Sequence, residues 1–135
     1  MGEAPTPEAS AVELAYSNRG SGPPLVILHG LYGSSTNWRT IANHFENSHE
    51  VYLPDLRNHG RSPWTPSMSF SEMASDLVQL LEQNASEAPI VIGHSLGGKV
   101  AMVLALNSPQ WVERLIVVDI APTTYPPKTH PHLIK

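Results

Sequence analysis

Residues 90–99 read Ile-Val-Ile-Gly-His-Ser-Leu-Gly-Gly-Lys and combine several signals in one stretch. The apolar run 90–92 predicts a buried strand, and the nearly all-apolar run 99–106 predicts a helix. Between them lies a G-x-S-x-G sequence. Its serine, Ser95, would sit on a sharp turn in a strained backbone conformation, and small residues at Gly93 and Gly97 would let strand and helix close up. An ordinary glycine-rich turn is the alternative, which the flanking strand and helix disfavour.

The rest of the chain alternates between strand and helix patterns. Short apolar runs predict strands at residues 12–17, 25–28, 51–53 and 115–118. A helix is expected over residues 37–45, and a second begins at Ser69-Phe70-Ser71-Glu72, which reads as a capping box. In that second helix one face is apolar, formed by Met73, Leu77, Leu80 and Leu81. The alternation predicts an α/β fold with a mostly parallel, doubly wound sheet that carries helices on both faces. Strand 115–118 is apolar at every position, which fits a strand covered on both faces.

Length and composition limit the possible classes of protein. The chain has 135 residues, no cysteine and a formal net charge of −4 without charge blocks. We therefore expect one domain or part of one, no disulfide framework, and no binding of nucleic acid. No apolar run approaches the roughly 18 residues of a membrane span.

The two ends of the chain differ from its centre. We expect a flexible lead-in over residues 1–12, a folded core over 13–121, and a proline-rich segment over 122–135. The lead-in lacks the basic start and apolar middle of a signal peptide. This predicts a soluble intracellular protein and leaves open whether it is cytoplasmic or organellar.

Residues 29–33, His-Gly-Leu-Tyr-Gly, follow the predicted strand 25–28. A serine nucleophile needs backbone N–H donors for the oxyanion that develops on the substrate. In this arrangement one donor is the residue after the serine, Leu96, and the other comes from the loop after this earlier strand, for which we choose Leu31. His29 and Gly30 would support that loop. A plain glycine turn is the alternative.

Asp119 follows the predicted strand 115–118. Because parallel sheets place ligands at the carboxyl ends of their strands, this carboxylate could orient a catalytic imidazole. A turn or cap aspartate is the alternative reading.

The other polar candidates favour structural roles. Residues 55–62, Asp-Leu-Arg-Asn-His-Gly-Arg-Ser, suit a hydrogen-bonded turn better than direct catalysis. His59 is a poor candidate for the base, because it precedes Ser95 whereas the expected order is serine, acid, histidine. His130 and His132 form a close pair in a proline-rich tail. The histidines show no paired ligand spacing, so no metal site is predicted.

Four motifs in this order resemble the α/β-hydrolase superfamily, and within it the small serine esterases of bacteria and mitochondria. They lie at residues 29–34, 55–63, 93–99 (where Gly98 follows the serine motif) and 118–122. The resemblance implies Ser95 as nucleophile, Asp119 as acid, and no metal or organic cofactor. It disfavours the dehalogenase and epoxide-hydrolase branches, which carry aspartate at the nucleophile position.

Members of that subgroup are considerably longer and add a helical cap, further strands and the catalytic histidine. We therefore expect the histidine beyond residue 135 and a truncated sheet, with an exposed apolar edge at residues 112–118 that invites self-association. The function expected is hydrolysis of small-molecule carboxylic esters or thioesters through an acyl-enzyme. The alternatives are an inactive fragment that binds a ligand or partner, and a lipase-like or perhydrolase-like relative.

Overall fold

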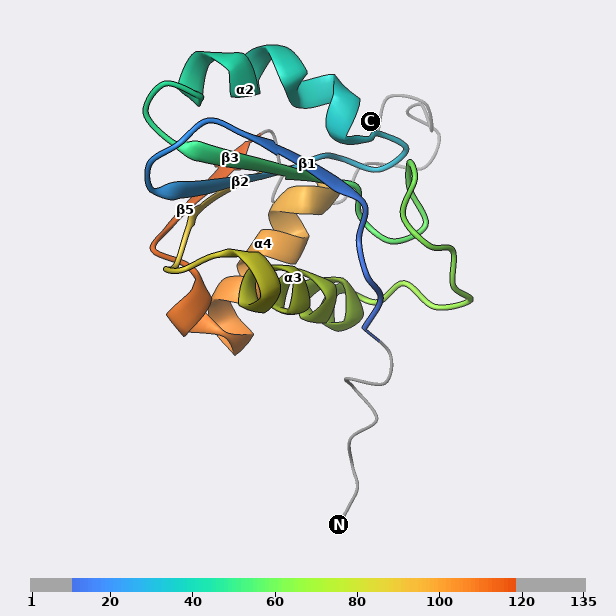
Figure 1. Ribbon diagram of the computed structural model, residues 1–135. Helices are drawn as coiled ribbons and strands as arrows, with labels where there is room; N and C mark the ends of the chain where they lie inside the picture. The colour runs from blue at the N-terminus through green and yellow to red at the C-terminus, as the bar shows by residue number, and fades with distance from the viewer. Residues whose placement is uncertain (1–10, 119–135) are drawn as a thin grey trace.

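The computed structural model describes residues 11–118 and contains one five-stranded sheet (Figure 1). The strands are β1 (Tyr16–Arg19), β2 (Pro24–Leu28), β3 (Glu50–Pro54), β4 (Ile90–His94) and β5 (Arg114–Val118). Their order is β1-β3-β2-β4-β5, with β1 antiparallel to β3 and every other pair parallel. The predicted mostly parallel α/β sheet is confirmed.

Helices cover both faces of the sheet. In Figure 1 helix α2 (Arg39–Phe45) lies on one face, while α3 (Phe70–Asn84) and α4 (Leu96–Asn107) lie on the other. Two short 3-10 helices complete the described elements, η1 (Ser35–Trp38) before α2 and η2 (Pro109–Trp111) before β5. The crossovers therefore wind in both directions from the centre of the sheet, as the alternating pattern predicts.

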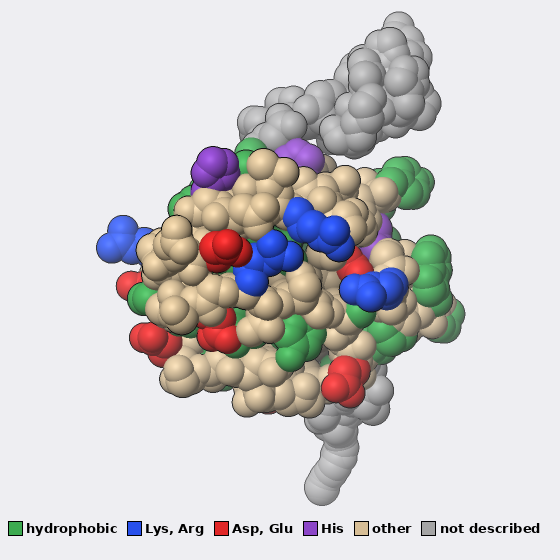
Figure 2. Space-filling view, turned by 45° about the horizontal axis from the view of Figure 1, so that its top comes forward, with side chains coloured by type: hydrophobic (Ala, Val, Ile, Leu, Met, Phe, Trp, Pro, Cys, Tyr) green, Lys and Arg blue, Asp and Glu red, His purple; other side chains and the backbone are tan. Residues whose placement is uncertain are grey.

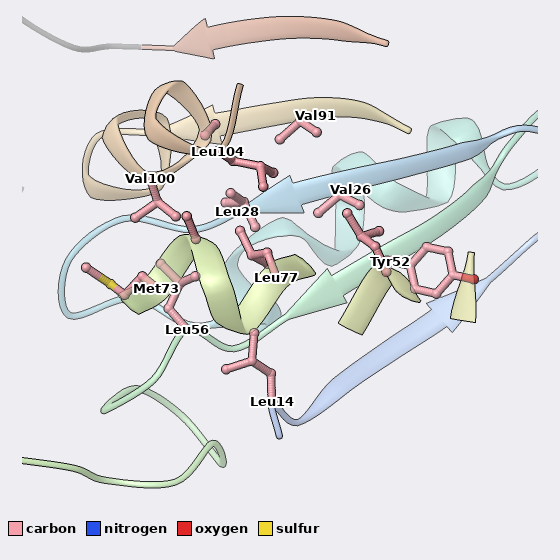
Figure 3. Close-up of a cluster of buried hydrophobic side chains, with 13 residues drawn as sticks. Leu14, Val26, Leu28, Tyr52, Leu56, Met73, Leu77, Val91, Val100 and Leu104 are labelled. Carbon is pink, nitrogen blue, oxygen red and sulfur yellow. The ribbon is translucent and has the colours of Figure 1, made fainter. Parts of the chain in front are cut away.

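Alternating side chains of the central strands fill two separate cores. Val26 and Leu28 of β2 point to the side of α3 and α4, where they join the larger cluster shown in Figure 3. Leu25 and Ile27 point to the opposite side and pack with Ala42 of α2. Because successive residues of a strand face opposite sides, a strand that is apolar throughout requires a cover on both.

Helix α3 begins as its capping box predicts. The Glu72 N–H donates to Ser69 Oγ at 3.1 Å, and the Ser69 N–H donates to Glu72 Oε1 at 3.0 Å. The apolar face expected from the sequence is buried. The capping box sets where the helix starts, and the buried apolar face sets how the helix is rotated about its axis on the sheet.

Two elements begin three or more residues from their predicted starts. The first strand was expected over residues 12–17 but lies at Tyr16–Arg19, because those are the residues in register with β3, from Tyr16 opposite Pro54 to Arg19 opposite Val51. Helix α4 begins at Leu96, three residues before the predicted start. Its first turn includes two glycines, which have poor helix propensity and are present for close packing rather than for helix formation.

A buried ion pair joins the loop after β3 to helix α3. Arg57 and Asp76 are both about 1% exposed, and they form a bidentate pair with Nε–Oδ2 at 2.8 Å and Nη2–Oδ1 at 2.9 Å. The hydrogen bond with Asp76 raises the pKa of the Arg57 guanidinium. Asp76 Oδ1 also accepts the N–H of Val12 at 2.8 Å, so the last residue of the expected lead-in is held against α3.

Strand β5 forms the edge of the sheet within the described residues. Leu115, Ile116 and Val117 are 38%, 46% and 38% exposed. The expectation that both faces of this strand are covered is therefore not met within residues 11–118, whereas an exposed apolar edge is present there. In the same part of the chain, no helix combines the length and apolar character that crossing a membrane requires.

Candidate active site

Ser95 lies at a sharp turn between β4 and α4. Its backbone has φ 56° and ψ −115°, a region that residues with a side chain rarely occupy. A Cβ atom at Gly97 would lie 2.5 Å from the carbonyl oxygens of Leu28 and His29, and one at Gly93 would collide with the backbone of Gly97. The predicted strained turn with obligatory glycines is therefore present, and it holds the start of α4 tightly against β2.

The loop after β2 lies directly beside this serine. A Cβ atom at Gly30 would be 3.3 Å from Ser95 Cβ, so the Gly30 backbone passes against the Ser95 side chain. The loop closes as a tight turn, in which the Gly33 N–H donates to the Gly30 carbonyl at 3.0 Å and Tyr32 adopts φ 63°. The loop after β2 and the Ser95 turn are thus packed together at the carboxyl ends of β2 and β4.

Two backbone donors are available at this junction. Within residues 11–118 neither the Leu31 N–H nor the Leu96 N–H has a hydrogen-bond acceptor. The Leu96 N–H belongs to the first turn of α4, where the helix dipole favours negative charge. Gly98 is buried in the same turn, and its N–H donates to the Ser95 carbonyl at 2.9 Å.

His29 supports the loop as a neutral ring. It is fully buried, its Nδ1 donates to the Gly30 carbonyl at 2.8 Å, and its Nε2 accepts the Leu56 N–H at 3.0 Å. A ring that accepts at Nε2 cannot carry a proton there. Burial lowers the pKa of His29 below its ordinary value of 6.5, and the neighbouring His59 lowers it further.

The lowered pKa of His29 predicts a loss of stability in mild acid. Above pH 6.5 the ring is neutral in both the folded and the unfolded chain, so the full free energy of unfolding is retained. As the pH falls below that value the unfolded chain binds a proton that the folded chain resists. The free energy of unfolding should then fall, by at most about 1.4 kcal/mol per pH unit for this one group.

Urea denaturation at pH 7.5 and pH 5.5 measures this effect. The change His29→Gln should reduce the difference between the two conditions, because Gln keeps a donor and an acceptor but does not titrate. The exposed His44 provides the matched control, since His44→Gln should retain the pH dependence of the unmodified chain. Equal pH dependence in all three proteins would show that His29 is not the group responsible.

Asp55 connects the loop after β2 to the loop after β3 by hydrogen bonds near the site. Its carboxylate accepts the Ser35 N–H at 2.7 Å and the Arg61 N–H at 3.2 Å. Burial alone would raise the pKa of this carboxyl, but these hydrogen bonds outweigh burial and the pKa lies below its ordinary value. Gly60, at φ 51°, lies so close that a Cβ there would meet the carboxyl group. The structural role expected for residues 55–62 agrees with these contacts.

Two clefts flank the loop after β2. One, of about 510 Å³, is bounded by Leu31 and Tyr32 together with Trp38, Ile41 and His94. The ring of His94 packs against Trp38 at a centroid distance of 5.6 Å. The second cleft, of about 460 Å³, is bounded by the same loop and by residues of the loop between β3 and α3. Of the lining residues, Leu31 was predicted as an oxyanion donor and His59 was disfavoured as a base, whereas Tyr32, Trp38 and Trp64 were not predicted. Trp64, an aromatic residue in a polar, proline-containing loop, was an available signal.

The remaining predicted site residues lie outside the described part of the chain. These are Asp119, His130 and His132. The described residue nearest to Asp119 in sequence is Val118, whose carbonyl accepts the Ser95 N–H at 3.2 Å. Within residues 11–118 no group of three or more His, Asp or Glu side chains is placed to hold a metal ion.

The parallel sheet, the strained serine turn and the adjacent loop with available N–H donors define an α/β hydrolase. Residues 23–134 match the alpha/beta hydrolase fold family, and the chain belongs to that family.

Among individual proteins, the chain is similar to the sn-1-specific diacylglycerol lipase ABHD11 of Danio rerio, with 45% identity over 129 residues that cover 92% of this chain and 41% of that protein. It is 38% identical to the esterase YbfF of Escherichia coli, over 84% of this chain and 44% of that protein. Of solved structures, a marine microorganism esterase has a TM-score of 0.83 and 47% identity, covering 91% of this chain and 47% of the other. The chain thus spans less than half the length of these relatives, which are named as lipases or esterases.

Proposed function

We propose that this chain carries the nucleophile half of a serine hydrolase that cleaves carboxylic esters or thioesters through an acyl-enzyme. The observation that carries the proposal is the strained turn at Ser95, packed against a loop with an available N–H at Leu31. A tetrahedral oxyanion would accept the Leu31 and Leu96 N–H groups. Donors fixed in advance stabilise the developing charge without reorganisation, and losing one typically costs about 10²–10³ in rate.

The proposed chemistry needs two further side chains. Ser95 Oγ bonds to the acyl carbon while its proton passes to a histidine, and the alcohol then leaves with that proton. Water hydrolyses the acyl-enzyme by the same route in reverse. We assign the histidine to sequence beyond Lys135 and its orienting carboxylate to Asp119. Asp119 is supported by its place in the sequence, because it directly follows Val118, whose carbonyl accepts the Ser95 N–H.

The relatives suggest the type of substrate. The zebrafish relative is named a diacylglycerol lipase, and the bacterial relative is named an esterase. Solved structures with similar folds include an epoxide hydrolase at 33% identity. Serine rather than aspartate at position 95 favours acyl transfer over epoxide opening. We therefore propose esters of glycerol or of similar small alcohols as substrates, with no metal or organic cofactor.

A burst experiment tests the acyl-enzyme directly. The full-length protein mixed with excess p-nitrophenyl acetate should release p-nitrophenol in a rapid phase equal in amount to the enzyme, followed by slower turnover. The reaction is also quenched with acid during turnover, and its peptides are analysed by mass spectrometry. If the ester is hydrolysed but no acetylated Ser95 peptide is found, the mechanism is contradicted.

A second candidate function is partner binding by the 135-residue chain through β5. The exposed apolar strand at the sheet edge favours it, since such an edge is a template for strand pairing. We expect a concentration-dependent dimer in sedimentation velocity. Ile116→Lys should abolish it, because a charge on an edge strand opposes pairing, whereas Leu106→Lys, at an exposed position of α4, should not. A chain that stays monomeric at every concentration would exclude this candidate.

A further inference from the structure

The second cleft beside the catalytic loop has a distinct lining. We call it the His59 groove and define it by Leu31, Tyr32, His59, Trp64 and Met68. It has a volume of about 460 Å³. Leu31 belongs both to this groove and to the loop that packs against Ser95. A ligand in the groove would therefore lie beside Leu31, whose N–H is the proposed oxyanion donor.

The outer wall of the groove is apolar and open to solvent. Tyr32 is 90% exposed, Trp64 is 75% exposed and Met68 is 36% exposed. Figure 2 shows hydrophobic side chains grouped at the right-hand edge of the molecule, the side on which the loop between β3 and α3 lies in Figure 1. Because grouped apolar side chains on a surface mark binding sites, the wall is suited to the carbon atoms of a ligand.

The inner wall offers one buried hydrogen-bond acceptor. His59 is only 6% exposed, and its Nδ1 lies 2.9 Å from the Arg57 carbonyl oxygen. A carbonyl oxygen can only accept, so Nδ1 is the donor, and in the neutral form of the ring Nε2 is left as an acceptor. Within residues 11–118 no group donates to this Nε2. A buried acceptor without a donor is costly, which favours a ligand that supplies one.

The lining also indicates the type of donor. A charged ammonium group would require a nearby carboxylate, and among residues 11–118 no Asp or Glu lines the groove. A neutral hydroxyl satisfies the acceptor and is compatible with the apolar wall. An alcohol that retains a free hydroxyl beside its ester bond, as a partial ester of glycerol does, has both features.

We propose that the His59 groove binds the alcohol part of the ester substrate and that His59 Nε2 accepts a hydrogen bond from a free hydroxyl on that part. The carbon atoms next to the hydroxyl pack against Tyr32 and Trp64. This assignment rests on the proposed ester hydrolysis, because it specifies the substrate of the same site. A site built to bond a hydroxyl discriminates against the analogue that lacks it, since the acceptor is then left unpaired.

Two esters that differ in a single group test the proposal in the full-length enzyme. These are 2-hydroxyethyl butyrate and n-propyl butyrate, in which a hydroxyl replaces a methyl group. The ratio of their kcat/KM values should favour the hydroxyl ester by about tenfold and should fall to about one in His59→Phe. Trp64→Ala should lower both values while retaining the ratio. A ratio that His59→Phe leaves unchanged would overturn the assignment.

A binding measurement on the unmodified 135-residue chain keeps the proposal testable if His59→Phe does not fold. The probes are 2-butoxyethanol and butyl propyl ether, which contain no ester bond to hydrolyse. They again differ only in a hydroxyl that replaces a methyl group. The ¹⁵N resonance of His59 Nε2 should shift on addition of 2-butoxyethanol and not with the ether. If the resonance shifts but the full-length protein hydrolyses no ester, the groove binds hydroxyl groups and the proposed hydrolase function is wrong. If the full-length protein hydrolyses esters but 2-butoxyethanol causes no selective shift, the assignment of the groove is wrong.

Discussion

Replacing Ser95 by alanine is expected to lower kcat for ester hydrolysis by the full-length protein by about 10⁶-fold, the magnitude typical for loss of a triad serine. The reason is chemical, because no acyl-enzyme can form without the Oγ atom. The fold should tolerate the change, since alanine adds no atom at a turn whose strained φ of 56° is already occupied by a residue with a Cβ. Initial rates with p-nitrophenyl butyrate, and circular dichroism of both proteins, measure activity and fold separately.

Ser21→Ala provides the matched control for this experiment. Ser21 is an exposed serine in the turn before β2 and lies outside the candidate site. Its replacement should leave kcat unchanged. A folded Ser95→Ala protein with more than a tenth of the original kcat would mean that another group performs the nucleophilic attack.

Replacing Asp76 by asparagine is expected to reduce the free energy of unfolding by about 3–5 kcal/mol, the usual cost of removing one partner of a buried ion pair. Asparagine preserves the shape of the side chain but removes the bidentate carboxylate from Arg57, which is about 1% exposed and keeps the more distant Glu72 carboxylate at 3.8 Å. The same change weakens the acceptor of the Val12 N–H. Such a loss is a large fraction of the 5–15 kcal/mol typical of a whole domain. Urea denaturation followed by tryptophan fluorescence measures it.

Two further proteins separate loss of the ion pair from loss of charge in general. Glu82→Gln removes an exposed acid from the same helix and should cost little. The double change Arg57→Met with Asp76→Leu removes both charges and should be more stable than Asp76→Asn, because no unpaired charge remains buried. If the double change were the least stable of the three, packing by Arg57 rather than its charge would be the main contribution.

Local patterns in the sequence were sufficient to predict the centre of the fold and the Ser95 turn. The glycine spacing that marks the Ser95 turn lies within two positions of the serine, so the sequence predicts the turn, although Gly97 also packs against the distant residues Leu28 and His29. The capping box at Ser69 is similarly complete within four residues. The parallel sheet follows from strand and helix alternation, which is also a property of consecutive segments. These features were therefore predicted with their correct residues.

Features that depend on distant segments were not predicted. Arg57 and Asp76 are separated by 19 positions, and no local pattern connects them. The bounds of β1 depend on its register with β3 and not on its own composition. The His59 groove combines the loop after β2 with the loop after β3, so it exists only once the sheet has placed both loops side by side. Tertiary contacts decide each of these cases.

The role of Ser95 as nucleophile is tested most directly by mapping the site of covalent labelling by a fluorophosphonate in the full-length protein. The probe reacts with a serine only where a base and oxyanion donors are assembled around it. We expect one adduct, located on Ser95 by tandem mass spectrometry, and loss of esterase activity in proportion to labelling. Loss of activity with the adduct on another residue, or an active enzyme that the probe never labels at Ser95, would contradict this role.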